Sequence, residues 1–531
     1  MSAEWWKRGL IYQVYPRSFQ DSDGDGVGDL DGARRRLGYL RDLGVDAVWI
    51  SPIFVSPMAD FGYDVADYCA VDPLFGTLED FDALVEEAHR LGLKLILDFV
   101  PNHTSDQHPW FKESRSSRDN PRRDWYIWRD AKPDGSAPNN WLSHFGGSGW
   151  EWDAATGQFY YHAYLKQQPD LNWRNPEVRA AMFEVMRFWL GRGVDGFRVD
   201  VLWHLIKDAQ FRDNPPNPDF RPGQAGIERF LQTRSTDQPE VHAVVAEMRQ
   251  VMAAYPDRVL IGEIYLPVDR LVTYYGAGLS GAQLPFNFQL LQAPWDGGEI
   301  AGIIRRYERA LPPGAWPNWV LGNHDRPRIV GRVGEAQARV AAMLLLTLRG
   351  TPTLYYGDEL GLPQVQIPPD VVQDPWEKNE PGLGLGRDPC RTPMPWDASP
   401  HAGFTTGAPW LPLNDDWTTR NVAAEAADPG SMLELYRRLI VLRRTSQALS
   451  LGDYVAVSAE EGMLVFERRG AGERWLVALN FTHEARRAEA PLDAVWTWAL
   501  STSPAGPRDL VQGRFELVPD EGVILRAVAA G

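Results

Sequence analysis

The stretch Leu78-Glu-Asp-Phe-Asp-Ala-Leu-Val-Glu-Glu-Ala-His-Arg-Leu-Gly-Leu-Lys-Leu-Ile-Leu-Asp-Phe-Val100 contains both halves of a repeating structural unit. Its first half, Leu78–Leu91, places apolar residues at helical spacing with charged residues between them, which predicts an amphipathic helix. Its second half, Leu93–Val100, is almost continuously apolar, which is typical of a strand buried on both faces. A helix followed by such a strand indicates a parallel sheet covered by helices.

The same alternation recurs along most of the chain. Strand-like runs occur eight times, at Leu10–Pro16, Ala47–Pro52, Leu93–Val100, Gly196–Val201, Val259–Ile264, Gln283–Phe288, Trp319–Asp325 and Thr351–Gly357. Further helical patterns lie between them, at Leu30–Leu43, Pro176–Leu190 and Glu335–Leu348. Eight strands that alternate with helices predict an α/β fold of the (β/α)8 TIM-barrel type.

Two long segments interrupt the alternation. Residues 101–173 are too long and too rich in Pro, Asn, Trp and Asp for an ordinary loop, so we expect an inserted domain there. The barrel would then comprise residues 1–100 and 174–453, with an irregular, Pro- and Gly-rich insertion at 358–430 and a closing helix at Met432–Arg444. Residues 454–531 should form a C-terminal antiparallel β-sandwich. Its strand-like runs are Tyr454–Val457, Leu464–Arg468, Trp475–Leu479 and Val523–Ala527.

Composition excludes several classes of protein. The chain has 531 residues, of which 44% are hydrophobic and 24% charged, as in an ordinary globular protein. Its formal net charge of −17 disfavours binding to nucleic acids and to anionic membranes. Two cysteines provide no disulfide framework, and neither a signal sequence nor a membrane-spanning run is evident. We therefore expect a cytoplasmic protein that is a monomer or a small homo-oligomer.

Polar residues gather where the predicted strands end. They are Asp98, Asn102 and His103 after the third strand, Arg198 and Asp200 on the fourth, Glu263 on the fifth, Asn323, His324 and Asp325 on the seventh, and Asp358 and Glu359 after the eighth. In a barrel of this type, the carboxyl ends of the strands form the active site. A single carboxylate at such a position is usually structural. Several buried carboxylates at one rim are costly without a function, because each loses its hydration.

Paired carboxylates suit glycoside hydrolysis, in which one attacks the anomeric carbon and the other protonates the leaving oxygen. The chain has no glycine-rich dinucleotide loop, Walker loop or nucleophile elbow, so no catalytic cofactor is expected. Arg198 precedes Asp200 by two residues, which places both side chains on one face of a strand. A cation there would keep Asp200 ionised, as a nucleophile requires.

Six motifs together resemble the alpha-amylase superfamily of glycoside hydrolases. Four correspond to its signature segments: DFVPNH at 98–103, GFRVD at 196–200, GEIY at 262–265 and NHD at 323–325. QPDLN at 168–172 and RTPMPWD at 391–397 are similar to its oligo-1,6-glucosidase and alpha-glucosidase branch.

The resemblance implies a role for each matching position. Asp200 would be the nucleophile, Glu263 the general acid and then base, and Asp325 the stabiliser of the transition state, with Arg198 orienting Asp200. The substrate-binding positions would be His103 and His324 at sugar hydroxyls, Tyr63 beneath the sugar ring, and Asp60 with Arg391 closing the non-reducing end. A closed end implies exo action. Asp98 and Asp358 are interpreted as structural, and Asp170 and His204 as supporting residues or contacts on the aglycone side.

An acidic loop, Asp21-Ser-Asp-Gly-Asp-Gly-Val-Gly-Asp29, forms a second group of polar residues. Four carboxylates that alternate with glycines suit a hard cation, although the glutamate that completes an EF-hand loop is missing. The alternative is a solvated turn, which like-charge repulsion makes costly. In the branch that the chain resembles, this loop holds structural Ca²⁺ or Mg²⁺. The ligands here would be Asp21, Asp23, Asp25, Asp29 and the main-chain oxygen of Val27.

The expected function is therefore a retaining, exo-acting alpha-glucosidase that hydrolyses terminal glucose from small oligosaccharides or disaccharides. One alternative is an alpha-glucosyl transferase or sucrose isomerase, which would use the same covalent intermediate. A second alternative is a non-catalytic sugar-binding homologue, against which the complete set of catalytic residues argues.

Val201, which follows the predicted nucleophile, bears on the linkage. In the branch that the chain resembles, valine here accompanies alpha-1,6 substrates, whereas alanine or threonine accompanies alpha-1,4 substrates. An alpha-1,6 bond has one extra rotatable carbon, so its aglycone can swing clear of a branched side chain. The alternative is that Val201 is simply a β-branched strand residue whose side chain points away from Asp200.

Overall fold

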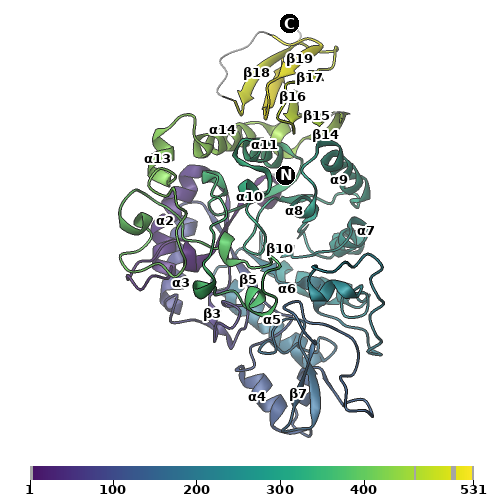
Figure 1. Ribbon diagram of the computed structural model, residues 1–531. Coiled ribbons are helices and arrows are strands. Elements are labelled where there is room, and N and C mark those ends of the chain that lie inside the picture. Colours follow the sequence, from purple (N-terminus) through teal and green to yellow (C-terminus); the bar gives the residue numbers. More distant parts are fainter. Residues whose placement is uncertain (1–3, 460–461, 504–509, 529–531) are drawn as a thin grey trace.

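The computed structural model describes residues 4–459, 462–503 and 510–528. The predicted barrel and C-terminal domain therefore include a few positions, such as 1–3 and 529–531, that lie outside the described residues. Eight parallel strands form the central sheet (Figure 1), in the order β11-β10-β9-β5-β2-β1-β13-β12. Their bounds are β1 Ile11–Val14, β2 Ala47–Ile50, β5 Lys94–Phe99, β9 Gly196–Val199, β10 Val259–Gly262, β11 Leu284–Pro285, β12 Asn318–Val320 and β13 Thr351–Tyr355.

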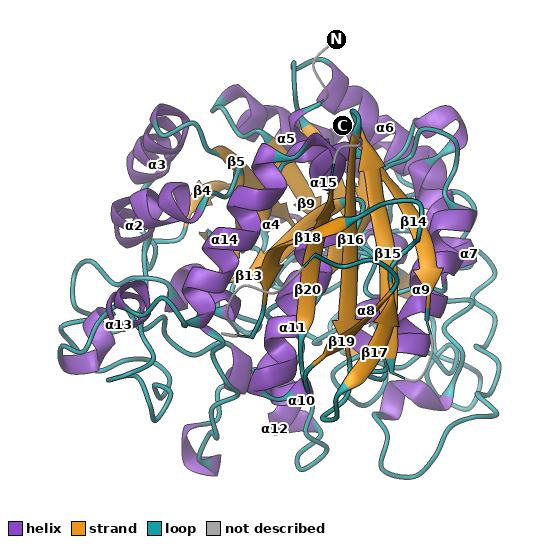
Figure 2. Cartoon of the chain, turned by 90° about the horizontal axis from the view of Figure 1, so that it is seen from above, coloured by secondary structure: helices purple, strands orange, loops and turns teal. Residues whose placement is uncertain are grey.

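All eight predicted strands are present, and the (β/α)8 prediction is confirmed. The strands are shorter than their apolar runs, mainly at the carboxyl ends, where the chain turns into loops. Helices surround the sheet (Figure 2), and the main ones are α2 Leu30–Leu43, α3 Leu78–Arg90, α5 Pro176–Gly191, α6 Val241–Ala253, α9 Gly297–Ala310, α11 Glu335–Thr347 and α14 Met432–Thr445. Shorter helices are α1 Trp5–Arg8, α7 Val268–Leu271, α8 Gln289–Gln292, α10 Ile329–Val333 and α15 Gln447–Leu451.

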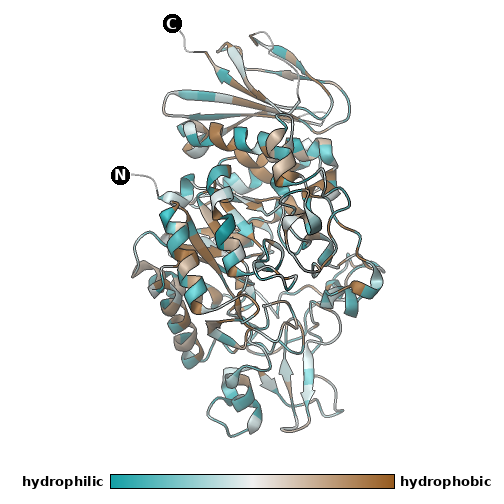
Figure 3. Ribbon diagram, turned by 90° about the vertical axis from the view of Figure 1, so that its left-hand side faces the viewer, coloured by the Kyte–Doolittle hydropathy of each residue, from teal (hydrophilic) through white to brown (hydrophobic). Residues whose placement is uncertain are grey.

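Alternation along the strands separates two apolar layers. Ala47 and Trp49 of β2 belong to a cluster inside the barrel, whereas Val48 and Ile50 pack in the layer between sheet and helices. Several helices carry both hydrophilic and hydrophobic colours (Figure 3), as helices with one covered face do. On β5, Ile96 belongs to the inner cluster, and Asp98 lies two residues further along the same face. The inner face therefore changes from apolar to charged toward the carboxyl ends of the strands.

The segment after β5 forms a small unit at one end of the barrel, opposite the C-terminal sheets (Figures 1 and 3). It contains α4 Pro109–Ser116 and a three-stranded antiparallel sheet of β6 Trp128–Arg129, β8 Gln158–Tyr161 and β7 Trp150–Asp153. A second small antiparallel pair, β3 Phe54–Val55 with β4 Asp67–Val71, was not predicted. It holds the loop that carries Asp60 and Tyr63. Residues 358–430 contain only short helical turns, among them α12 Pro375–Asn379 and α13 Val422–Ala427.

The C-terminal part is built from antiparallel sheets, as predicted. The larger sheet has the order β14-β15-β16-β20-β18, and β17 pairs with β19. Their bounds are β14 Asp453–Ser458, β15 Met463–Gly470, β16 Glu473–Asn480, β17 Arg486–Glu489, β18 Trp496–Ser501, β19 Arg514–Leu517 and β20 Gly522–Ala527. Across the part of the chain that the structure describes, no helix combines the length and the apolar character needed to cross a membrane.

Two buried arginines near the junction of this sheet with the barrel have no carboxylate partner among the described residues, and one of them, Arg468, joins the sheet to α11. Arg443 of α14 donates to the carbonyls of Leu346 and Leu348, and Arg468 of β15 donates to those of Thr347, Leu449 and Gly452. Burial lowers the pKa of Arg443 to about 10 and lowers the pKa of Arg468 as well. The carbonyl ends of α11 and α15 provide the partial negative charge that compensates both cations.

Replacing Arg468 with methionine should therefore destabilise the protein. The Arg468→Met variant keeps most of the side-chain volume but removes the arginine donor from the carbonyls of Thr347 and Gly452 and one of two arginine donors from that of Leu449, which should lower the free energy of unfolding by about 2–4 kcal/mol. Thermal and urea unfolding would measure the change. Arg487→Met is the matched control, because Arg487 lies exposed on β17 and its loss should change stability by less than about 0.5 kcal/mol. Equal effects of the two substitutions would contradict this role of Arg468.

Candidate active site

A pocket opens at the carboxyl ends of the strands, where the inserted segment meets the barrel. Its lining comprises Asp60, Tyr63, His103, His144, Phe145, Tyr164, Asp200, Val201, Trp203, Glu263, Tyr265, Gln292, His324, Asp325, Arg326, Trp376 and Arg387. The structure thus brings the three predicted catalytic carboxylates together with five predicted substrate-binding residues. Arg198 and Arg391, the other two, are fully buried behind the lining.

Arg198 organises the carboxylates at the bottom of the pocket. Its Nη1 lies 2.7 Å from Asp200 Oδ1 and 2.9 Å from Asp98 Oδ1, and its Nη2 lies 2.9 Å from Glu263 Oε2. The guanidinium also lies 4.9 Å from the centre of the Trp49 ring. One buried cation therefore faces three carboxylates, and this group carries excess negative charge.

That excess negative charge favours binding of a proton. Burial raises the pKa of Asp200 well above its ordinary value, and repulsion from Glu263 raises it further. Burial also raises the pKa of Glu263, although Arg198 opposes this shift. If Glu263 holds the proton, its repulsion of Asp200 disappears and Arg198 keeps Asp200 ionised. The pair can therefore supply one acid and one ionised nucleophile at the same pH.

Val201 does not lie in a strand, contrary to the sequence prediction. β9 ends at Val199, and Val201 has φ 37°, in the left-handed region that is unfavourable for a β-branched residue. This turn directs the Val201 N–H to Glu263 Oε2 at 2.8 Å and places the side chain at the pocket wall. Strand alternation was the wrong basis for its orientation, because the strand has ended before this residue.

Asp325 lies between two arginines of the segment 358–430. Arg391 Nη2 is 3.0 Å and Arg387 Nη1 is 3.4 Å from Asp325 Oδ1. Burial alone would raise the pKa of Asp325, but His324, Arg387 and Arg391 outweigh it and hold that pKa below its ordinary value. Asp325 is therefore a permanent negative charge facing the pocket.

The closed end of the pocket differs from the predicted arrangement. Asp60 pairs with Arg387, whose Nη2 lies 2.6 Å from Asp60 Oδ1, and not with Arg391. Arg391 instead donates from Nε to the carbonyl of His324 at 2.8 Å, in addition to its contact with Asp325. Asp374 holds Arg387 from behind, with Oδ1 2.6 Å from the same Nη2. One signal could have identified Arg387 from the sequence: it is a second arginine, four residues before Arg391, in a segment expected at the active site.

Tyr63 and the two predicted histidines form a connected network. Tyr63 Oη is 2.7 Å from His324 Nε2 and 3.1 Å from Asp98 Oδ2, while the Tyr63 and His324 rings stack at 5.3 Å. Gln13 Nε2 donates to His324 Nδ1 at 2.8 Å, which places the ring proton of His324 on Nε2. Burial lowers the pKa of His103 to about 4 and that of His324 well below its usual value. Both histidines are thus neutral, and the ring nitrogens of each lie within hydrogen-bond distance of neighbouring protein groups.

Sequence reasoning missed the side of the pocket beyond Glu263. Aromatic residues from several elements form it, namely Phe145, Tyr164, Trp203, Tyr265 and Trp376, together with His144, Gln292 and Arg326. The abundance of tryptophan and tyrosine was the only signal, and it did not identify individual positions. Flat aromatic faces of this kind suit contacts with sugar rings.

Four further residues lie outside the lining. Asp98 binds Arg198, and Asp358 is fully buried, which raises its pKa to about 7. Asp170 accepts hydrogen bonds from Lys207 Nζ and Asn102 Nδ2 at 2.6 and 2.9 Å, so it joins the inserted segment to the barrel. His204 is 1% exposed and lies behind His144, with the ring centres 5.0 Å apart.

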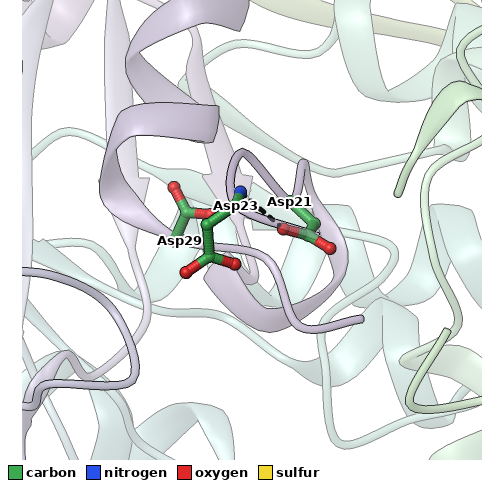
Figure 4. Close-up of side chains that lie close together, drawn as sticks. All are labelled: Asp21, Asp23 and Asp29. Atoms are coloured by element: carbon green, nitrogen blue, oxygen red, sulfur yellow. Dashed lines mark hydrogen bonds between the residues drawn. The ribbon is translucent and has the colours of Figure 1, made fainter. Parts of the chain in front are cut away.

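The acidic loop lies beside Thr405 and Ala408, away from the pocket. Figure 4 shows Asp21, Asp23 and Asp29 side by side, and one carboxylate oxygen from each lies within 4.8 Å of the others. Asp25 is not part of this group, and its carboxylate accepts a hydrogen bond from Val27 N at 2.7 Å. The structure thus brings together three of the four predicted acids. Gly26, at φ 93°, has no room for a side chain, since a Cβ there would lie 1.9 Å from Ala408 O.

The comparisons with known proteins agree with this geometry. Residues 13–452 match the model of the alpha-amylase catalytic domain. A probable alpha-glucosidase of Rhizobium meliloti is 43% identical, covering 92% of this chain and 91% of that protein. An oligo-1,6-glucosidase of Heyndrickxia coagulans is 39% identical, covering 94% and 95%.

Two solved structures extend the similarity to the whole chain. The alpha-glucosyl transfer enzyme XgtA is 40% identical, with a TM-score of 0.93, covering 99% of this chain and 100% of that one. The trehalulose synthase MutB of Pseudomonas mesoacidophila is 37% identical, with a TM-score of 0.92 and the same coverage. With its eight-stranded barrel and its carboxylates at the strand ends, this chain belongs to the alpha-amylase family of glycoside hydrolases.

Proposed function

We propose that the protein is a retaining, exo-acting alpha-glucosidase that releases glucose from the non-reducing ends of short alpha-glucosides. The observation that carries the proposal is the binding of Asp200 and Glu263 to one guanidinium, inside a pocket whose far end the Asp60–Arg387 ion pair closes. Retaining enzymes need carboxyl groups about 5–5.5 Å apart, and a shared cation supports a short separation.

The residues of the pocket divide the chemistry between them. Asp200 attacks the anomeric carbon while protonated Glu263 gives its proton to the leaving oxygen, which forms a glucosyl ester and frees the aglycone. Glu263 then takes a proton from water, and that water attacks the ester to release glucose and regenerate Asp200. Asp325, held ionised by Arg387 and Arg391, stabilises the positive charge that develops on the sugar ring.

Glucosyl transfer is the second candidate function. The observation in its favour is the high similarity to an alpha-glucosyl transfer enzyme and to a trehalulose synthase over the whole chain. Transfer uses the same ester and differs only in whether water or a sugar hydroxyl attacks it. A product time course with isomaltose, maltose, sucrose and trehalose separates the two, because hydrolysis yields free glucose throughout whereas transfer yields new saccharides early.

Asp200→Asn tests the nucleophile. The amide has nearly the same shape as the carboxylate, so folding should be preserved, but kcat should fall by about three orders of magnitude or more because no ester forms. Circular dichroism and steady-state kinetics would measure the two effects. In the native enzyme, a mechanism-based fluoroglucoside followed by peptide mapping should label Asp200. A label on any other residue would rule out this assignment.

A preference for alpha-1,6 linkages is the finer part of the proposal. Val201 lies at the pocket wall, and its N–H binds the same Glu263 carboxylate that protonates the leaving oxygen. Its branched side chain therefore stands near the scissile bond. An alpha-1,4 aglycone attaches directly to a ring carbon and would meet a Val201 methyl group. The extra carbon of an alpha-1,6 linkage lets the aglycone move away.

The linkage preference should depend on one methyl group. We expect kcat/KM for isomaltose to exceed that for maltose, and Val201→Thr to shift this ratio toward maltose. One such contact is worth about 1–3 kcal/mol, or roughly 10- to 200-fold. Steady-state kinetics with both disaccharides would measure the ratio. A native preference for maltose, or an unchanged ratio in the variant, would refute the linkage proposal and leave the alpha-glucosidase assignment intact.

The acidic loop is proposed to hold a structural Ca²⁺ or Mg²⁺ ion. Ligands on opposite sides of a calcium ion, each about 2.3–2.6 Å away, lie about 5 Å apart, so the oxygens of Asp21, Asp23 and Asp29 fit such an ion. The ion would hold three carboxylates together and thereby fix the turn before α2. Asp25 and the main-chain oxygen of Val27 would complete the proposed set of ligands.

Chelation should therefore lower stability more than catalysis. Removing the ion leaves three carboxylates to repel one another, so the melting temperature should fall by several degrees while kcat per folded molecule stays near normal. Calorimetry before and after chelation, with Ca²⁺ and then Mg²⁺ added back, would measure the effect. Asp23→Asn should reduce the stabilisation by added metal, whereas Asp42→Asn, an exposed control on α2, should not. An unchanged melting temperature with lost activity would contradict the structural role.

A further inference from the structure

One cation at the pocket lacks the partner that the others have. Arg387 pairs with Asp60 and Asp374, and Arg391 with Asp325, whereas no described carboxylate lies within 4.0 Å of the Arg326 guanidinium. Its Nε is covered and has no hydrogen-bond partner among the described residues. Burial without such partners is costly for a charged group. The contact with Tyr265 is the one side-chain hydrogen bond that the described residues provide for this cation, so its terminal N–H groups can also donate to a ligand.

The position of Arg326 is on the aglycone side. Its guanidinium lies 5.3 Å from the centre of the Tyr265 ring, and Tyr265 follows the proposed acid Glu263 by two residues. Burial alone would lower the pKa of Arg326, but Tyr265, Asp325 and Glu263 raise it, so the group stays charged. The Asp60–Arg387 pair closes the opposite, glucose-binding end. A group beside Glu263 therefore faces whatever is attached to the leaving oxygen.

We propose that Arg326 is a specificity-determining residue that holds a sugar aglycone by donating hydrogen bonds to its hydroxyl groups, with the aglycone lying among the aromatic side chains of the pocket lining. This inference rests on the proposed alpha-glucosidase function and names the class of its substrates, which is disaccharides and short oligosaccharides rather than simple alkyl or aryl glucosides. The aromatic lining supports a ring-shaped aglycone. Asp200, Glu263 and Asp325 argue against an anionic one, because they would repel it.

Comparing isomaltose with glucosyl fluoride measures the contribution of the aglycone, because the two substrates share the glucosyl group and differ in the leaving group. The leaving group of glucosyl fluoride is a fluoride ion, which is too small to reach Arg326, whereas isomaltose places a second glucose there. In Arg326→Met, kcat/KM for isomaltose should fall about 10- to 100-fold relative to kcat/KM for glucosyl fluoride, as expected for the loss of hydrogen bonds to a charged donor. The loss should appear mainly in KM, because the contact is the same in the bound substrate and in the transition state. Arg326→Lys should restore part of the ratio.

A matched control distinguishes this role from the general effect of replacing any arginine whose side chain lies over an aromatic ring. Arg129 lies 3.7 Å from the centre of the Phe211 ring, outside the pocket lining, and Arg129→Met should leave the ratio unchanged. If Arg326→Met lowered kcat/KM equally for both substrates, the proposal would be wrong. Arg326 would then act on the catalytic carboxylates and not on the aglycone. If the native enzyme cleaved glucosyl fluoride but no disaccharide, the proposal that the aglycone is a sugar would be wrong. Failure of the native enzyme on both substrates would instead refute the proposed function itself.

Discussion

The buried contact of Arg198 with three carboxylates is the interaction on which the rest of the site depends. Arg198 and Asp98 are fully buried, and each buried charge loses hydration worth several kcal/mol. Only close, fixed partners offset that loss, so the guanidinium cannot move without leaving Asp98, Asp200 and Glu263 to repel one another. The barrel provides this rigidity, because β5, β9 and β10 are neighbouring strands whose register fixes the three elements from which these side chains come.

The distribution of cations makes the two ends of the pocket different. At the end proposed to bind glucose, Arg387 and Arg391 form ion pairs with Asp60, Asp374 and Asp325, which close that end. At the aglycone end, the walls are mainly aromatic and the one pocket-lining arginine is unpaired among the described carboxylates. Under the proposed function, a glucose ring would meet fixed polar partners, whereas the aglycone would meet surfaces that tolerate different rings. That difference is consistent with relatives that share this architecture but are named for hydrolysis, transfer or isomerisation.

Sequence periodicity was sufficient for the barrel, because buried parallel strands and amphipathic helices have distinct patterns that local physics dictates. It also located Asp200, Glu263 and Asp325 among the polar residues at the strand ends, but the resemblance to the alpha-amylase superfamily was needed to assign them catalytic roles. It failed where irregular loops determine geometry. Arg387 contacts Asp60 because of the path that the irregular segment 358–430 takes, and that segment has no periodic pattern from which its path could be predicted. The backbone turn at Val201 depends on its hydrogen bond to Glu263, a residue 62 positions away. Such contacts have no local signal.

The segment 358–430 connects the acidic loop to the catalytic carboxylates. On one side, Thr405 donates to Asp21, and Trp410 N donates to the carbonyl of Gly26 at 3.0 Å. On the other side, the same segment supplies both arginines that hold Asp325. Ser18, close before the acidic loop, donates to the carbonyl of Arg391 and so links the two sides directly. A loop remote from the chemistry can therefore stabilise the position of Arg391 through packing alone, and its acids need no contact with the substrate to be important for the enzyme.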